Sequence, residues 1–147
     1  MSKILVVYHS MSGNTEAAAE LVAKGACSVE GTDAETKEAL KATSEDLLNS
    51  DGIAVGTPDY FSYMAGGLKD FFDRTYYPTQ GQVTDKPCAI FVTHGGGGRA
   101  VESVKSMCQK FKFKMVGEPV LVKGRPEGEA EQQLLEIGKA LAEACTS

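Results

Sequence analysis

The sequence contains no tryptophan, two histidines and four widely spaced cysteines. No pair of cysteines has the C-x-x-C spacing of zinc sites and thioredoxin-type dithiols, so neither kind of site is predicted. We expect the cysteines to be reduced and mostly buried, like small apolar side chains in a cytoplasmic protein. They are Cys27, Cys88, Cys108 and Cys145.

Long apolar segments are also absent. The longest near-continuous run covers residues 4–8, far short of the roughly 20 residues that span a bilayer. The residues before this run contain no small-residue cleavage site, so we expect no signal peptide, no membrane insertion and a cytoplasmic location. The net charge of −5 disfavours nucleic acids and anionic membranes as partners.

The sequence does contain an alternation of β-rich runs and helical patterns. Strands are predicted over residues 3–8, 34–37, 52–57 and 88–93, with a fifth inside 114–122 that bends near Gly117 and Pro119. Pro58 is expected to end the third strand, the helix after it to end before Pro78, and residues 75–86 to form a surface excursion. Five such units predict one α/β domain over residues 1–147, a doubly wound five-stranded parallel sheet with helices on both faces.

The loop after the first predicted strand is rich in hydroxyl groups and has no lysine or arginine. Gly13 lets the backbone approach a ligand closely, and the free N–H groups of the following helix attract an anion. The lysine of a Walker A loop and the G-x-G-x-x-G of a dinucleotide fold are both missing. We interpret the loop as a cradle for the phosphate of a mononucleotide, and the alternative is that Ser12 or Asn14 merely caps the helix. The loop consists of Ser10, Met11, Ser12, Gly13, Asn14 and Thr15.

This six-residue motif resembles the FMN-phosphate loop of flavodoxins, whose usual form is Ser/Thr-x-Thr/Ser-Gly-Asn/Thr-Thr. The motif stands at the same place, directly after the first strand, and the wider pattern covers nearly the whole chain. The resemblance implies a flavodoxin-like three-layer sandwich. It also implies one FMN, bound non-covalently along the carboxyl ends of the strands.

The segment after the third predicted strand carries three aromatic residues and a methionine within residues 57–64. Together with the Gly-Thr-Pro at residues 56–58, it is similar to bacterial NAD(P)H:quinone oxidoreductases and NAD(P)H-dependent FMN reductases of the flavodoxin-like fold. In those families this loop touches the flavin. The alternative is that the aromatic side chains cover the core beneath the loop. The resemblance implies flavin contacts for Thr57, Pro58, Asp59, Tyr60 and Phe61.

A run of four glycines follows the fourth predicted strand. In the quinone reductases a glycine-rich loop at this place lies along the pyrimidine side of the flavin, where bare backbone offers N–H and C=O groups. The alternative for the glycine run is a flexible turn before the next helix. The alternative for His94 is an ordinary loop histidine without a role in binding. The resemblance implies flavin contacts for His94, Gly95, Gly96 and Gly97.

Two functions follow from the resemblance, and both leave the chemistry to the flavin, without catalytic side chains or a metal. The first is an oxidoreductase that passes electrons from NAD(P)H through FMN to a quinone or similar acceptor. The alternative is a flavodoxin that carries single electrons between redox proteins, which the short chain and the lack of a recognisable nicotinamide site favour. The absence of glycine from residues 57–64 disfavours the peptide flip typical of one-electron carriers. A homodimer is compatible with either function.

Overall fold

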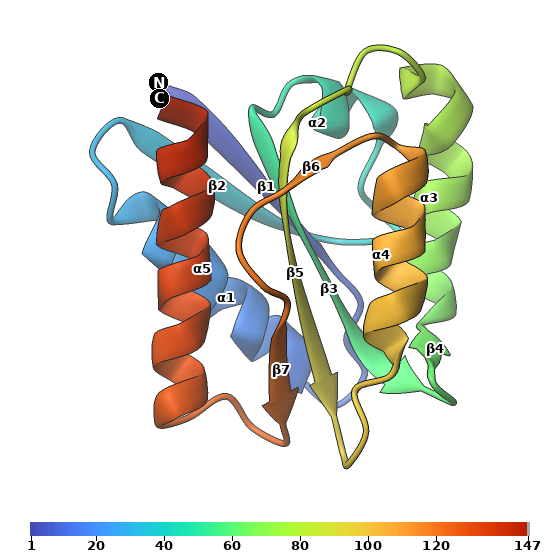
Figure 1. Ribbon diagram of the computed structural model, residues 1–147, viewed down its shortest axis with the longest axis vertical. Helices are drawn as coiled ribbons and strands as arrows, with labels where there is room; N and C mark the ends of the chain where they lie inside the picture. The colour runs from blue at the N-terminus through green and yellow to red at the C-terminus, as the bar shows by residue number, and fades with distance from the viewer. Residues whose placement is uncertain (147) are drawn as a thin grey trace.

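The computed structural model describes residues 1–146, which form a twisted sheet between two layers of helices (Figure 1). The strands are β1 (Ser2–Tyr8), β2 (Thr32–Glu38), β3 (Gly52–Tyr60), β4 (Tyr63–Met64), β5 (Pro87–His94), β6 (Lys114–Met115) and β7 (Val120–Lys123). The helices are α1 (Asn14–Cys27), α2 (Ser44–Leu48), α3 (Gly66–Thr79), α4 (Ala100–Lys110) and α5 (Glu129–Thr146). None of the helices within this described part of the chain is long and apolar enough to cross a membrane.

The strand order is β2-β1-β3-β5, and both β6 and β7 pair with β5 at the same edge. These pairs are parallel, whereas β4 forms an antiparallel hairpin with β3. Because β6 and β7 share one position, the doubly wound five-stranded parallel sheet is confirmed. The break between them lies near Gly117, whose φ of +66° marks the predicted bend. The chain changes winding direction between β1 and β3, and ligands of such sheets bind outside the carboxyl ends of the strands there.

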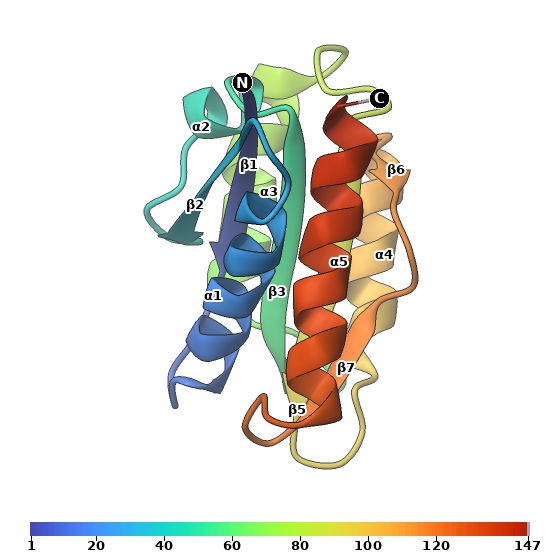
Figure 2. The ribbon, with the colours of Figure 1, turned by 90° about the vertical axis from the view of Figure 1, so that its left-hand side faces the viewer.

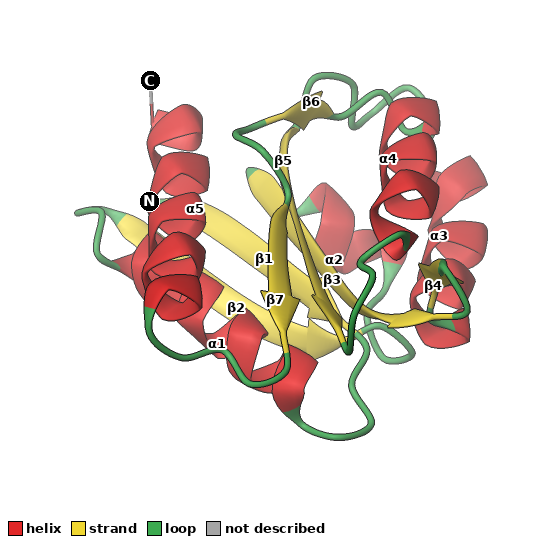
Figure 3. Cartoon of the chain, turned by 60° about the horizontal axis from the view of Figure 1, so that its bottom comes forward, coloured by secondary structure: helices red, strands yellow, loops and turns green. Residues whose placement is uncertain are grey.

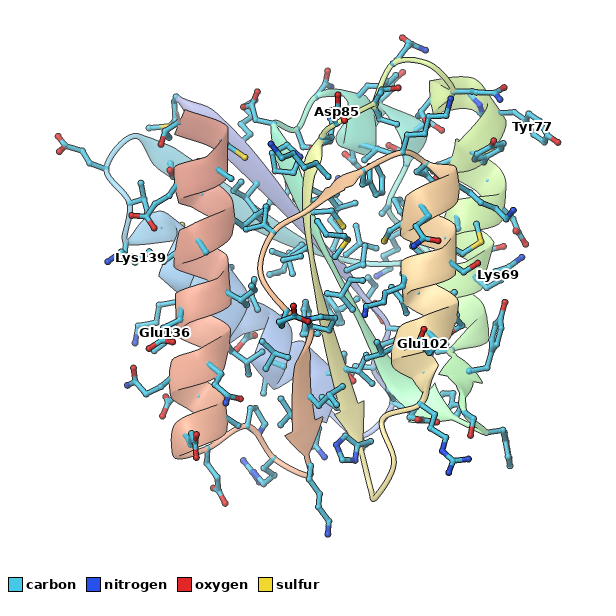
Figure 4. The ribbon with its side chains drawn as sticks, in the orientation of Figure 1. Lys69, Tyr77, Asp85, Glu102, Glu136 and Lys139 are labelled. Atoms are coloured by element: carbon cyan, nitrogen blue, oxygen red, sulfur yellow. The ribbon has the colours of Figure 1, made fainter. Side chains whose placement is uncertain are left out.

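Helices cover both faces of the sheet (Figure 2), and each face has its own apolar core. Helices α1 and α5 cover one face around Val22, Phe91 and Leu134. Helices α2, α3 and α4 cover the other, around Leu47 and Phe71 among others. Charged side chains on the helices, such as Glu136 and Lys139 of α5, point away from the sheet into solvent (Figure 4). Burial of one stripe on each helix therefore fixes how the helices lie on the sheet.

Strand β3 continues through Pro58 to Tyr60, so the prediction that Pro58 ends it was wrong. The pairing of β3 with β1 stops at Gly56, opposite Tyr8, whereas its pairing with β5 reaches Pro58. Pro58 therefore lies where β3 has an open edge on its β1 side. Proline is tolerated at an edge, because no ladder hydrogen bond is needed from its nitrogen.

Helix α3 also runs further than predicted, through Pro78 to Thr79. The buried hydroxyls of Thr75 and Thr79 each donate to the carbonyl four residues back, at 2.8 Å. These bonds hold the last turns in helical form beside the proline, which lacks an N–H donor. The predicted surface excursion is correspondingly shorter, because Thr75, Thr79 and Val83 are buried.

The cysteines follow the sequence expectation only in part. Cys88 of β5 and Cys108 of α4 are buried, with their Sγ atoms 3.7 Å apart. Cys27 is exposed because it ends α1 on the side that faces solvent, and Cys145 near the end of α5 is half-buried. All four are free thiols.

Helices α1 and α5 meet backbone to backbone at two glycines. A Cβ atom on Gly25 would lie 2.0 Å from the carbonyl oxygen of Leu135. A Cβ atom on Gly138 would lie 2.0 Å from the carbonyl oxygen of Val22. Such distances leave no room for a methyl group, so the approach of the two helices requires glycine at both positions.

We therefore expect Gly138→Ala to lower the free energy of unfolding by about 2 kcal/mol or more, since overpacking outweighs the roughly 1 kcal/mol by which alanine favours a helix. The matched control is Gly66→Ala in α3, where a Cβ atom would have no neighbour within 4 Å. That change should leave stability unchanged or raise it by about 0.5–1 kcal/mol. Urea unfolding curves measure both, and equal effects would show that the helix contact tolerates a side chain.

Candidate functional site

The three loops singled out in the sequence lie together at the carboxyl ends of β1, β3 and β5. Figure 3 turns this end of the sheet toward the viewer and shows the loops around the ends of the strands. The three strands are neighbours in the sheet. Beyond β1, the amide of His9 still donates to the Gly56 carbonyl at 3.2 Å, so the first loop leaves the sheet beside β3.

The first loop leaves the amino end of α1 without a side-chain cap. The N-cap residue is Gly13, with φ 97° and ψ −12°, and no side chain accepts a hydrogen bond from the first turn. The alternative that Ser12 or Asn14 merely caps the helix is therefore wrong. Ser10 shapes the loop instead, because its Oγ accepts from the Gly13 amide at 3.1 Å. Open space lies where a Gly13 side chain would be, and the missing side-chain cap leaves first-turn amides available to an anion.

Thr15 joins the first loop to the end of β5. Its side chain is buried, and its Oγ1 lies 2.7 Å from Oγ1 of Thr93. The hydroxyl is thus engaged inside the protein, which fixes the first turn of α1 against the sheet. The remaining members of the loop reach solvent, since Met11 and Ser12 are exposed and Ser10, Gly13 and Asn14 are partly exposed.

Tyr8, directly beneath the first loop, is a neutral hydrogen-bond donor. Its hydroxyl donates to Oε2 of Glu16 on α1 at 3.0 Å. Burial and the neighbouring Glu16 carboxylate raise the pKa of Tyr8 to about 12. The phenol therefore stays protonated at any physiological pH and keeps β1 linked to the first turns of α1.

The second loop is a hairpin whose predicted contact residues lie mostly inside β3. Thr57, Pro58, Asp59 and Tyr60 belong to this strand. The buried Thr57 hydroxyl accepts from the Ala65 amide at 2.8 Å and lies 2.7 Å from the Pro58 carbonyl oxygen, to which it donates. Thr57 therefore supports the base of the hairpin.

The tip of the hairpin is a two-residue turn made without glycine. Tyr60 pairs with Tyr63, and the residues between them, Phe61 and Ser62, have φ values of 56° and 65°. Two successive positive φ angles define a type I′ turn, which suits the twist of a hairpin. Phe61 is fully exposed and Tyr63 is 46% exposed, so the alternative that the aromatic side chains cover the core is wrong for these two.

His9 is a site residue that the sequence analysis missed. Its ring meets the ring of Tyr60 edge to face, with centroids 6.1 Å apart and planes at 82°. A Cβ atom on Gly67 would lie 2.3 Å from Nδ1 of His9, so this glycine makes room for the imidazole at the start of α3. The Gly66-Gly67 pair was the only sequence signal of such a close approach.

The third loop presents bare backbone beside a cavity. Gly95, Gly96 and Gly97 are exposed, and Cβ atoms on the first two would meet nothing within 4 Å. The ring nitrogen Nδ1 of His94 is buried without a hydrogen-bond partner in the described part of the chain. A cavity of about 320 Å³ is lined by Asp59, Ser62, His94, Gly95, Gly96, Gly97 and Arg99.

Both carboxylate oxygens of Asp59 accept hydrogen bonds from backbone amides. Oδ1 accepts from the Ser62 amide at 2.8 Å, and Oδ2 accepts from the Ala100 amide at 3.0 Å. Its side chain therefore binds the protein's own backbone and connects the second loop to the third.

The residues present fit an FMN. At one end, an uncapped helix terminus without nearby lysine or arginine in the loop suits a phosphate bound by N–H and O–H donors. At the other end, an aromatic hairpin and side-chain-free backbone suit the flat ring and its polar edge. The buried, unpartnered His94 nitrogen beside the cavity also fits a site that accepts a polar ligand.

Comparison with known proteins gives the family. Residues 19–126 match the family model of NADPH-dependent FMN reductases. A flavodoxin from Aquifex aeolicus (strain VF5) is 35% identical over 160 aligned positions, which cover 97% of this chain and 86% of the relative. An NAD(P)H dehydrogenase (quinone) from Acidithiobacillus ferrooxidans (strain ATCC 53993 / BNL-5-31) is 35% identical over 144 positions, covering 81% and 72%.

Among solved structures, a flavodoxin from the domain Archaea superposes with a TM-score of 0.89 at 26% identity, covering 99% of both chains. The fold, the site geometry and these relatives agree with one another. The chain belongs to the NADPH-dependent FMN reductase family, a family of FMN-binding proteins with the flavodoxin-like fold.

Proposed function

We propose that this protein is an FMN-dependent oxidoreductase that takes two electrons from NAD(P)H and passes them to a quinone or similar acceptor. The observation that carries the proposal is the amino end of α1, where Gly13 leaves the first-turn amides without a side-chain cap beside the ends of β1 and β3. The matched family and the relative named NAD(P)H dehydrogenase (quinone) support the electron donor and acceptor.

In this proposal the first loop holds the FMN phosphate. The backbone amide of Asn14 and the Ser12 hydroxyl donate to it, while the Gly13 amide donates to Ser10 Oγ and so keeps the loop in shape. Thr15 contributes its amide, because its hydroxyl is bonded to Thr93. Met11, which is 79% exposed, covers the outer side of the loop.

The second and third loops hold the ring. Tyr60 and Phe61 offer flat apolar surfaces, with Thr57 and Pro58 beneath them, while the backbone of Gly95, Gly96 and Gly97 meets the polar edge. The open space at Gly95 and Gly96 supports this assignment. His94 lines the cavity beside this backbone, and its Nδ1 is buried without a hydrogen-bond partner in the described residues. FMN supplies the redox chemistry when it is bound, and these residues orient it and exclude water.

The hairpin turn favours two-electron transfer over one-electron carriage. Turning the peptide between Phe61 and Ser62 would convert a type I′ turn into type II′, which demands at Phe61 a conformation that glycine alone adopts readily. A carrier that depends on such a flip is thus disfavoured.

The second candidate, a one-electron carrier between redox proteins, is supported by the relatives named flavodoxin, one of which matches this chain over nearly its whole length. For either function we propose a single domain in the cytoplasm, and a homodimer is the assembly to look for.

Replacing Ser12 with alanine should weaken FMN binding by about tenfold or more and leave riboflavin binding nearly unchanged, since a hydrogen bond to a charged group contributes about 1.5–3 kcal/mol. Quenching of flavin fluorescence during titration measures both affinities. The control is Ser106→Ala on the exposed side of α4, which should change neither. Equal weakening of both ligands by Ser12→Ala would remove the phosphate assignment.

Stopped-flow mixing of the FMN-loaded protein with NADPH or NADH should bleach the flavin absorbance at a rate that saturates with nucleotide concentration. Subsequent addition of a quinone should restore the absorbance. The expected reason is direct transfer to FMN held at an open, solvent-facing hairpin. A flavin that dithionite bleaches but neither nucleotide does would contradict the reductase and favour the carrier.

A further inference from the structure

We propose that Asp59 is a positioning residue that fastens the β3–β4 hairpin to the amino end of α4 and so sets the distance between the two loops that hold the flavin ring. This inference rests on the proposed FMN site, which it deepens. Asp59 takes no part in the redox chemistry and acts through the backbone segments that it joins.

The carboxylate of Asp59 bonds two amides from different parts of the chain. Oδ1 accepts from Ser62 within the hairpin turn at 2.8 Å, and Oδ2 accepts from Ala100 at 3.0 Å. Ala100 is the first residue of α4, where the helix dipole favours a negative charge. One side chain therefore caps the helix and closes the turn at the same time.

A second contact between the same two segments runs through Ser103 on α4. Its Oγ accepts from the Met64 amide at 3.0 Å and donates to the Ala100 carbonyl at 2.7 Å. Both strands of the hairpin are thus tied to the first turn of α4. Since Met64 is buried, this second tie also anchors the hairpin to the core.

These ties matter because few hydrogen bonds among the described residues hold the third loop, one of them from the Val101 amide to the Gly98 carbonyl at 3.3 Å. At its start, the His94 carbonyl accepts from the Gly124 amide at 3.0 Å, and at its end Asp59 holds Ala100. Between these points, glycine backbone has more conformational freedom than any other residue type. The same carboxylate bonds Ser62 in its left-handed conformation, so it orders both loops at once.

Asp59 also distinguishes two helix termini at the same end of the sheet. The amino end of α4 is occupied by this carboxylate, whereas that of α1 has no side-chain cap. The negative charge of Asp59 therefore disfavours a second anionic group at the amino end of α4. The ring end of the site is kept for a neutral, flat group.

The test compares Asp59→Asn with Asp59→Glu, Ser103→Ala and a control, Asp33→Asn. Asn retains the size of Asp but has one acceptor oxygen, so one of the two amides meets an NH₂ group. Glu retains the charge but displaces it by one methylene. Asp33 is exposed at the amino end of β2, and its replacement removes the same charge far from the three loops.

We expect Asp59→Asn and Asp59→Glu to weaken FMN and riboflavin by the same factor, about tenfold or more, and Ser103→Ala to do so to a smaller extent. The control variant should bind both flavins like the wild type. If Asp59 acted only through its charge, Asp59→Asn would bind the FMN dianion more tightly and riboflavin as the wild type does. Asp59→Glu would then bind both flavins like the wild type. That pattern, or unchanged binding in all variants, would overturn the proposal.

Amide hydrogen exchange of the flavin-free protein gives a readout that does not depend on FMN. In Asp59→Asn, exchange at Ser62 and Ala100 should quicken by about tenfold or more, with no change in Asp33→Asn. Unchanged exchange at both amides would refute the clamp. If the wild type binds no flavin, the proposed function fails and exchange alone decides whether the clamp exists. If Asp59→Asn does not fold, Ser103→Ala decides, through the same exchange and flavin titrations.

Discussion

The site depends on the parallel register of β1, β3 and β5. Tyr8 lies opposite Gly56, and Gly56 lies opposite Phe91, so β1 ends first, while β3 continues to Tyr60 and β5 to His94 at the same end of the sheet. The loops that follow the three strands therefore lie next to one another. A shift of one strand by a residue would turn its buried side chains to the other face of the sheet, so the two apolar cores hold this register. The position of the binding loops is thus a consequence of core packing.

Several helices begin at this end of the sheet, and two of them, α1 and α4, differ in what bonds their first amides. Helix α1 begins after Gly13 with its first amides free of side-chain caps, while Asp59 occupies the amino end of α4. Helix dipoles make both ends favourable for negative charge. The open amino end of α1, directly after the hydroxyl-rich loop, is therefore the place proposed for an external phosphate. In the proposed binding mode, the ring of the mononucleotide extends toward the hairpin and the glycine loop.

The sequence predicted the features that depend on local pattern. Apolar runs located the core strands, and the hydroxyl-rich motif at residues 10–15 located the open amino end of α1. The predictions that Pro58 ends β3 and that α3 ends before Pro78 were wrong. A strand or helix can continue through proline where the fold needs no hydrogen bond from that nitrogen, and the sequence does not reveal this. Gly117 was correctly read as a bend, since a positive φ is a local property.

What the sequence could not predict are contacts between residues distant along the chain. The hydroxyl pair of Thr15 and Thr93 joins residues 78 positions apart, and the bond from Ala100 to Asp59 spans 41. The edge-to-face contact of His9 with Tyr60 likewise requires the sheet to bring two loops together. That Asp59 contacts the flavin stays a prediction, and the structure shows its carboxylate accepting from the Ser62 and Ala100 amides. Its residue type suggests a ligand contact, whereas its two hydrogen bonds support the proposal that it links the hairpin to α4.

The most direct test of the account is an NMR titration that follows the backbone amides with FMN and, separately, with riboflavin. We expect FMN to shift the amides around Gly13 and those of residues 95–97, and riboflavin to shift only the second group. The phosphate end and the ring end are then resolved in one experiment. Shifts confined to the opposite end of the sheet, around the cavity lined by Asp51, Asp85 and Cys145, would contradict it. So would identical shifts around Gly13 with both ligands.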